Sequence, residues 1–349
     1  MQTTFNTADA MLAEPCAAVT VRAPGRLHLG FLDPAGSLGR RFGSLGLVVN
    51  GFETEIELMA SPDGRVAACG TGGPAELARA AACVDLLQRH SGRHEPLRLR
   101  LVRLLPAHAG FGSGTQLALA IGRAFALWHG LDVSTPTLAQ WLGRGLRSGV
   151  GIAGFDQGGL LVDGGPGADG AAASVLARLP LPAAWRVLVV QDGAHQGLSG
   201  SEELRAMATL APLPQALAAD ICHQILMRVL PGAAGAEFAP FAAGITRIQQ
   251  VLGEHFASAQ GGSAFTSAAV GRLIEWVARH GEPAAATGQS SWGPTGFAIL
   301  PSQAQAEALI AAARAANVVA PGLTLRIVSA RNTGATLVDQ RWAPGAPSR

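Results

Sequence analysis

The sequence predicts an α+β protein built from two domains. Its 349 residues exceed one ordinary domain. Some segments alternate apolar with polar residues as strands do, and others repeat apolar residues at helical spacing. A stretch rich in Gly, Ala and Pro at about 164–183 is the expected joint. We therefore expect a loose N-terminal arm at 1–18, a first domain at 19–180 and a second domain at 181–349.

The first domain is expected to open with strands. The segments 17–33 and 43–58 alternate small or apolar residues with polar ones, and 97–106 alternates leucine with arginine. A helix is expected at about 74–91, and another at about 116–128 because its apolar residues recur at helical spacing.

The second domain is expected to begin with the strand WRVLVV and to be mainly helical afterwards. No repeat of fixed period is visible along the chain. The remaining expected elements are helices at about 201–210, 214–230, 237–257, 267–280 and 303–316, followed by strands at 324–330 and 334–340.

The composition limits the possible chemistry. All 26 basic residues are arginine because the sequence contains no lysine. This excludes P-loop NTPases and pyridoxal phosphate enzymes, which depend on a lysine. The net charge of +2 gives no reason to expect a nucleic acid or a membrane as partner, so we expect a small ligand.

The four cysteines indicate a reducing compartment. They are far apart and form no CxxC pair, and the N-terminal residues do not resemble a signal peptide. No apolar stretch approaches the roughly 20 residues that span a bilayer. We therefore expect reduced thiols and a cytoplasmic protein.

A glycine-rich loop, PAHAGFGSGTQ at 106–116, precedes the second expected helix. A strand, a glycine loop and a helix in succession bring backbone N–H groups and the positive helix end together, which suits a phosphate. A turn kept only for packing is the alternative, and Thr115 stands where a Rossmann fingerprint needs glycine. The candidate phosphate-binding residues are Gly110, Gly112, Ser113, Gly114, Thr115 and Gln116.

Three motifs in this order resemble the GHMP superfamily of small-molecule kinases: APGR at 23–26, P-x-x-x-G-x-G-S-G at 106–114 and S-x-x-G-x-x-G at 290–296. The stretches RLHLGFLD, GFGSGTQLALAIG, GFDQGGLLVDGG and QSSWGPTGFAI resemble its non-kinase branch, the β-ribofuranosylaminobenzene 5′-phosphate synthases. The resemblance runs from about Val19 to Gln340. It implies a GHMP-kinase-like fold with a ribosomal-S5-like α/β N-terminal domain and a ferredoxin-like α+β C-terminal domain.

The branch implies a decarboxylating C-ribosyltransferase of tetrahydromethanopterin biosynthesis. Its substrates would be phosphoribosyl pyrophosphate (PRPP) and an aromatic acid, 4-aminobenzoate or 4-hydroxybenzoate, and its products would include CO2 and pyrophosphate. Mg²⁺ is the expected cofactor, acting with PRPP. The expected partners are thus small substrates, with no nucleic acid and no membrane, and the chain is compatible with a homodimer.

The sequence departs from the kinase pattern at two places. Gly114 stands where the kinases have a second serine that helps to hold magnesium, and Trp292 and Pro294 interrupt the glycine-rich third motif. Both departures weaken the interpretation as an ATP-dependent small-molecule kinase, which remains the alternative. A catalytically silent ligand-binding member is a third interpretation that the sequence leaves open.

Asp156 is the expected catalytic residue because it lies where the kinases often place an aspartate; an Asx-turn is its structural alternative. Arg26 and His28 share one face of a strand and could bind a carboxylate or the 5′-phosphate. For both, a purely structural or surface role remains open.

The third motif offers hydroxyl groups and an aromatic face to an aromatic acid, although its tryptophan could equally anchor a turn. Its candidate substrate-binding residues are Ser290, Ser291, Trp292 and Thr295. Elsewhere, Asp163 is expected to be only a turn residue, and Glu202 and Glu203 to cap a helix start. The role of Asn332 stays open.

Overall fold

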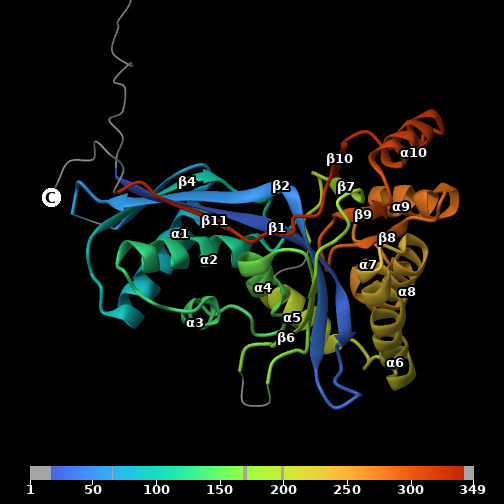
Figure 1. Ribbon diagram of the computed structural model, residues 1–349, viewed down its shortest axis with the longest axis horizontal. Coiled ribbons are helices and arrows are strands. Elements are labelled where there is room, and N and C mark those ends of the chain that lie inside the picture. The colour runs from blue at the N-terminus through green and yellow to red at the C-terminus, as the bar shows by residue number, and fades with distance from the viewer. Residues whose placement is uncertain (1–16, 65, 168–170, 198–199, 342–349) are drawn as a thin grey trace, which may run out of the picture.

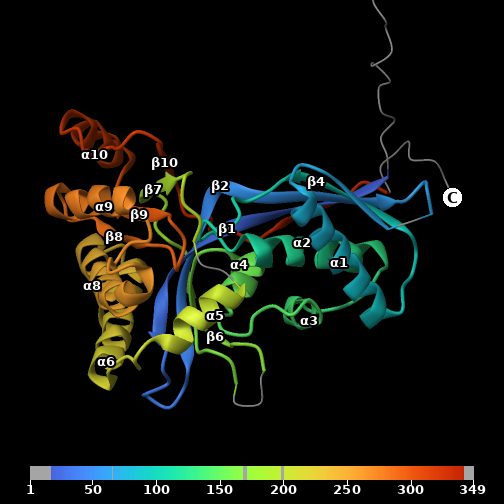
Figure 2. The same ribbon diagram turned by 180° about the vertical axis from the view of Figure 1, so that it is seen from behind.

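The structure is a computed structural model that describes residues 17–64, 66–167, 171–197 and 200–341. The expected arm at 1–18 lies almost wholly outside this range. The chain forms two units, each a sheet with helices, and a long hairpin of the first unit runs beside the second (Figures 1 and 2). Among the described residues, no helix combines the length and the apolar character that crossing a membrane requires.

The first unit is a seven-stranded sheet with the order β11-β1-β2-β4-β3, in which β5 also pairs with β2 and β6 pairs with β5. Its helices lie along one face of the sheet in both views (Figures 1 and 2). The strands are β1 (Ala18–Asp33), β2 (Phe42–Ala60), β3 (Ala67–Gly70), β4 (Leu97–Arg103), β5 (Leu160–Asp163), β6 (Val175–Leu179) and β11 (Thr336–Asp339). The helices are α1 (Pro74–Ser91), α2 (Ser113–Trp128), α3 (Thr135–Trp141) and α4 (Val150–Gln157).

The second unit is a four-stranded antiparallel sheet with the order β10-β7-β9-β8. Its strands are β7 (Arg186–Asp192), β8 (Ala286–Gln289), β9 (Gly296–Leu300) and β10 (Leu323–Val328). Its helical segments are α5 (Gly200–Thr209), α6 (Gln215–Gln224), η1 (Ile225–Val229), α7 (Leu230–Ala234), α8 (Phe238–Phe256), η2 (Ala257–Gln260), α9 (Ala268–His280) and α10 (Gln303–Ala315).

The hairpin of β1 and β2 joins the two units through a continuous apolar core. Leu27 and Leu29 of β1 are fully buried in a cluster that also contains Ile245 and Ile248 of α8 and Val187 of β7. Burial of such side chains stabilises the fold by roughly 1.5–3 kcal/mol each. The units are therefore held together by a shared core as well as by the connecting chain.

The last strand returns to the first unit. β11 pairs antiparallel with the start of β1, with Val19 opposite Asp339. The stretch expected as a joint, 164–183, contains β6, which pairs with β5. The first sheet thus includes strands from both sides of the expected boundary at 180.

Several predicted elements are confirmed within one or two residues, including α1, α8, α9 and α10. The helix expected at 214–230 is instead α6 followed by the π-helical turn η1 and α7. Strands β8 and β9 were not expected. They are fully buried and rich in glycine and alanine, so they lack the alternation that marks a half-buried strand.

The glycine-rich loop of the first unit touches the turn between β8 and β9. The Ser290 hydroxyl donates a hydrogen bond to the Gly110 carbonyl oxygen at 2.7 Å. A Cβ on Gly110 would lie 2.5 Å from the Ser290 carbonyl oxygen, and one on Gly293 would lie 2.5 Å from the Gly110 nitrogen. Glycine is required at both positions because two backbones approach each other there.

We expect Gly293→Ala to reduce the free energy of unfolding by about 1–3 kcal/mol, because its Cβ meets rigid backbone atoms. Gly193→Ala is the matched control, since nothing lies within 4 Å of its Cβ and neither glycine has a positive φ. The control should change stability by less than about 0.5 kcal/mol. Equal values for the two variants in urea denaturation would show that this contact carries no strain.

Candidate functional site

A cleft of about 620 Å³ lies where the glycine-rich loop, strand β1 and the β8–β9 turn meet. The loop supplies Gly110 and Gly112, and the first turn of α2 supplies Ser113, Gly114 and Thr115. Gly112 is the N-cap of α2 in the left-handed conformation with φ 72°, and no side chain caps the helix. The positive end of a 16-residue helix is therefore available to an anion in the cleft.

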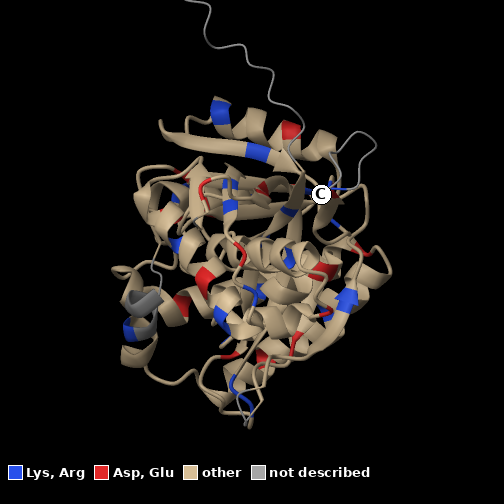
Figure 3. Ribbon diagram, turned by 90° about the vertical axis from the view of Figure 1, so that its left-hand side faces the viewer, with Lys and Arg blue, Asp and Glu red and all other residues tan. Residues whose placement is uncertain are grey.

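Arginine side chains line the cleft from three other elements. Arg26 comes from β1, Arg79 from α1, and Arg144 and Arg147 from the loop between α3 and α4. Among the described residues that line the cleft there is no aspartate or glutamate. Elsewhere on the ribbon, residues of both charges are interspersed (Figure 3). The cleft is thus a positively charged site in a nearly neutral protein. Arginine side chains are well suited to bind phosphate oxygens.

Contacts within the site fix the position of Arg26. Its side chain donates to the Gly110 carbonyl oxygen at 3.2 Å, and its backbone N–H donates to the Phe111 carbonyl oxygen. The guanidinium carbon lies 3.3 Å from where a Cβ on Gly112 would be. The arginine and the loop therefore form one surface, and a side chain at position 112 would press on it.

His28 is buried on the wall of the cleft. Its backbone N–H donates to the Ser290 hydroxyl at 2.9 Å, and its carbonyl oxygen accepts from the N–H of Ser291. Burial lowers the pKa of the imidazole well below its usual value, and the charges of Arg26 and Arg147 lower it further. The ring is therefore neutral near pH 7, with one nitrogen able to accept a hydrogen bond.

The structure brings most of the predicted binding residues together. Those that line the cleft are Arg26, His28, Gly110, Gly112, Ser113, Gly114, Thr115, Ser291 and Trp292. Gln116, Ser290 and Thr295 are buried and do not line it. Gln116 donates to the Gly151 carbonyl oxygen, and Ser290 joins β1 to the loop. These two side chains support the walls of the cleft.

Asp156 lies elsewhere. It is exposed near the end of α4, where its carboxylate accepts a hydrogen bond from the Thr135 hydroxyl at 2.7 Å. A Cβ on Gly151, near the start of α4, would lie 3.9 Å from the Arg26 Nε. Because Asp156 does not line the cleft, its catalytic role stays a prediction that the geometry does not support.

Asp163 does more than shape a turn. Its buried carboxylate accepts hydrogen bonds from the backbone N–H groups of Gly149, Val150 and Gly165. Burial raises its pKa, although these bonds oppose the shift. Asp163 holds the start of α4 and with it the end of the arginine-bearing loop.

Sequence reasoning missed Arg79, Arg144, Arg147 and His108 of the cleft lining. A signal existed for two of them, since GRGLRSG at 143–149 places two arginines among three glycines. Arg79 carries no such signal, because it stands in an ordinary amphipathic helix. Only tertiary packing brings it to the cleft.

Asn332 lies outside the lining of the cleft. Asn332 holds the backbone of Leu181 by two hydrogen bonds of 2.9 Å, so it ties the C-terminal segment to the connection between the units. Helix α5 begins at Gly200, but the side chains of Glu202 and Glu203 lie outside the described part of the chain.

The described residues of the cleft do not fit a divalent cation held by the protein alone. The lining offers the hydroxyl groups of Ser113, Thr115, Ser148 and Ser291 but no carboxylate. Nor does any group of three His, Cys, Asp or Glu among the described residues form a metal site. Mg²⁺ prefers carboxylate and phosphate oxygens. An ion here would have to take most of its ligands from a bound substrate.

The comparisons with known proteins agree with this architecture. Residues 77–161 match the GHMP kinases N terminal domain, and residues 238–319 match the GHMP kinases C terminal domain. Homoserine kinase from Cytophaga hutchinsonii superposes with a TM-score of 0.64 at 15% identity, covering 97% of this chain and 100% of that one. Mevalonate diphosphate decarboxylase from Staphylococcus aureus gives 0.66 at 14% identity, covering 92% and 98%. The fold is therefore that of the GHMP kinase superfamily.

Sequence relatives narrow this class. A β-ribofuranosylphenol 5′-phosphate synthase from Archaeoglobus fulgidus is 33% identical over 296 residues, which cover 81% of this chain and 88% of the relative. The protein of the same name from Methanothermobacter thermautotrophicus is 28% identical, covering 91% and 98%. This chain belongs to the family of the β-ribofuranosylphenol 5′-phosphate synthases.

Removing one cationic side chain tests the anion site. We expect Arg144→Gln to weaken pyrophosphate binding by about tenfold or more, because a charge-assisted hydrogen bond contributes roughly 1.5–3 kcal/mol. Arg272→Gln, at an exposed position of α9, is the matched control and should bind as the wild type does. Unchanged affinity of the Arg144 variant in calorimetry would contradict an anion site in this cleft.

A further prediction concerns pH. Because the pKa of His28 is lower in the folded protein, the unfolded chain takes up this proton first as the pH falls below about 6.5. The free energy of unfolding should therefore decrease between pH 7 and pH 5, and His28→Gln should make the decrease smaller. His280→Gln, at an exposed position, should leave it unchanged. Urea denaturation at both pH values measures this decrease. An equal decrease in the wild type and both variants would contradict the prediction.

Proposed function

We propose that this protein transfers the phosphoribosyl group of PRPP to the ring of 4-hydroxybenzoate or 4-aminobenzoate, with release of pyrophosphate and CO2. The observation that carries the proposal is the cleft, which four arginines line together with the N-terminus of α2. PRPP bears phosphate groups at both ends, so it matches a cleft with several separate cationic groups. The names of the relatives support the product class.

The cleft residues suit the departure of pyrophosphate. As the bond between ribose C1 and the leaving oxygen lengthens, negative charge grows on the pyrophosphate and positive charge on the sugar. The backbone of Gly112 to Thr115 and the guanidinium groups of Arg144 and Arg26 would stabilise the negative charge. Fixed donors of this kind need no rearrangement during the reaction.

The aromatic acid would then attack ribose C1 through the ring carbon that bears its carboxylate. A para hydroxyl or amino group donates electrons into the ring and makes this carbon nucleophilic. The new carbon–carbon bond interrupts aromaticity, and loss of the carboxylate as CO2 restores it with the electron pair of the broken bond. The transfer is redox neutral and needs no oxidant or reductant.

The proposed reaction includes Mg²⁺, which would bind together with PRPP. Since the described lining offers no carboxylate, we propose that the ion enters bound to the phosphate oxygens of the substrate. The protein's own contribution is then the positioning and the charge of its arginines. The product would serve a pathway that uses a ribosylated phenol or aniline, tetrahydromethanopterin synthesis in our proposal.

The stoichiometry of the products tests the proposed reaction. With carboxyl-labelled 4-hydroxybenzoate or 4-aminobenzoate, we expect labelled CO2 and pyrophosphate in equal amounts, dependent on PRPP and a divalent cation. Benzoate lacks the electron-donating group and should release no CO2. Pyrophosphate release without matching CO2 from both acids would contradict the proposal. Release of ADP from ATP with homoserine or mevalonate as acceptor would instead support the kinase alternative.

A further inference from the structure

A second, smaller pocket adjoins the cationic cleft. It measures about 30 Å³ and shares four lining residues with the cleft, namely His28, Phe31, Ser291 and Trp292. One water molecule needs roughly 10–15 Å³ of such space, so the pocket has room for more than one water-sized group. Apart from the neutral His28, none of the described residues that line it is ionisable, unlike those of the cleft.

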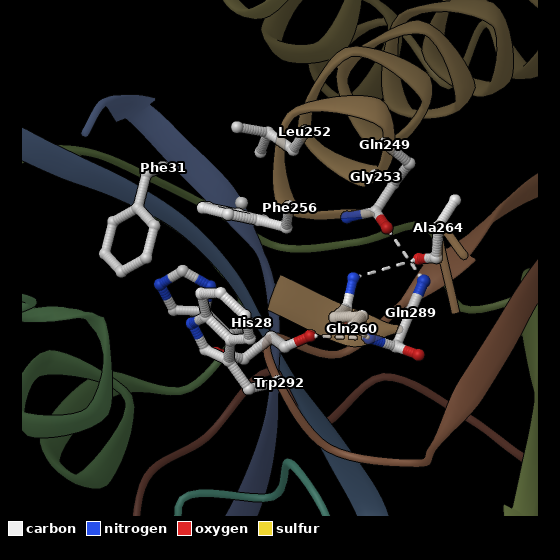
Figure 4. Close-up of a pocket in the computed structure, with 12 residues that line it drawn as sticks. His28, Phe31, Gln249, Leu252, Gly253, Phe256, Gln260, Ala264, Gln289 and Trp292 are labelled. Carbon is white, nitrogen blue, oxygen red and sulfur yellow. Dashed lines mark hydrogen bonds between the residues drawn. The ribbon is translucent and has the colours of Figure 1, made fainter. Parts of the chain in front are cut away.

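The walls of this pocket are aromatic on one side and carry amide groups on the other (Figure 4). The rings of Phe31, Phe256 and Trp292 form part of its surface, and Phe256 packs against Trp292 with ring centres 4.6 Å apart. Flat apolar walls of this kind suit an aromatic ring. The opposite side carries the side chains of Gln249, Gln260 and Gln289 (Figure 4).

The glutamine amides already have partners in the protein. Gln249 donates to the Leu29 carbonyl oxygen and accepts from the N–H of Gln289, both at 2.7 Å. The side chain of Gln289 donates to Gln260 and to the Ser291 carbonyl oxygen, and it accepts from the N–H of Thr266. These groups are therefore engaged in holding the wall in place.

Two ring nitrogens of the same pocket differ from the amides. The Nε2 of His28 and the Nε1 of Trp292 are buried and have no hydrogen-bond partner among the described residues. His28 and Trp292 are only 3% and 2% exposed, so water outside the pocket does not satisfy these atoms. A buried polar group without a hydrogen-bond partner destabilises a protein. A ligand that satisfies both atoms would recover this free energy.

We propose that the small pocket receives the para substituent of the aromatic substrate, and that His28 and Trp292 determine which substituent is accepted. The Nε1–H of Trp292 can only donate, and the Nε2 of a neutral His28 accepts in the tautomer that carries the proton on Nδ1. A phenolic hydroxyl matches this pair because it donates one hydrogen bond and accepts another. An aromatic amino group donates readily but accepts poorly, so it satisfies only His28.

This assignment, which rests on the proposed function, also orients the ring. With its para group in the small pocket, the carboxylate-bearing carbon points toward the cationic cleft, where ribose C1 would lie. The reacting carbon and the recognised substituent are at opposite ends of the ring. The arrangement therefore lets one pocket select the acceptor while the other binds PRPP. It predicts a preference for 4-hydroxybenzoate over 4-aminobenzoate.

Binding measurements on two variants test the assignment. Trp292→Phe keeps an aromatic ring but removes the N–H, and His28→Phe removes the acceptor. In calorimetry with pyrophosphate present, each should weaken 4-hydroxybenzoate binding by about tenfold and leave benzoate and pyrophosphate binding unchanged. His255→Phe is the matched control, because His255 precedes Phe256 on α8 but does not line the pocket.

Equal losses for 4-hydroxybenzoate and benzoate, or no loss in a folded Trp292→Phe protein, would overturn the assignment. So would tighter binding of 4-aminobenzoate than of 4-hydroxybenzoate by the wild type. These results differ from those that would refute the proposed function. The proposed function fails if the wild type releases neither CO2 nor pyrophosphate from PRPP with either acid. If His28→Phe does not fold, the result for Trp292→Phe still tests the assignment.

Discussion

The close approach of two backbones, the glycine-rich loop and the β8–β9 turn, is the constraint on which the rest of the structure depends. At Gly110 and Gly293 there is no space for a side chain, and the hydroxyl of Ser290 joins the loop to β1. The same contact places Ser291 and Trp292 beside the N-terminus of α2. The cleft exists because segments about 180 residues apart in sequence are held in contact.

Several helices and loops that have a local pattern in the sequence were predicted correctly. The helical spacing of apolar residues located α1, and the glycine-rich loop before α2 indicated an anion site. Glycine there has two separate causes, however. Gly112 provides a left-handed N-cap at the cleft, whereas Gly110 makes room for the turn of the other unit. No spacing rule separates these causes, because the second depends on a backbone distant in sequence.

Side chains whose place depends on tertiary packing were harder to foresee. Asp156 occupies a motif that suggests catalysis, yet one helix carries Gly151 toward the cleft and Asp156 away from it. Gln116 belongs to the glycine motif, but its side chain donates a hydrogen bond to the backbone of α4 and so supports the wall of the site. The place of Arg79 could not be predicted, because only the packing of α1 in the fold brings it to the cleft. A motif identifies a segment, and the fold decides which of its side chains reach the ligand.

The return of β11 to the edge of β1 has a consequence for synthesis on the ribosome. Strands β1 and β2 emerge early, and they bury apolar residues against α8 and against the second sheet. The pairing partner of β1 at its outer edge emerges only after β10. An unfinished chain therefore exposes both an open strand edge and an uncovered apolar hairpin, the surfaces from which aggregation starts. The hairpin is therefore fully covered only after the C-terminal end of the chain has been made.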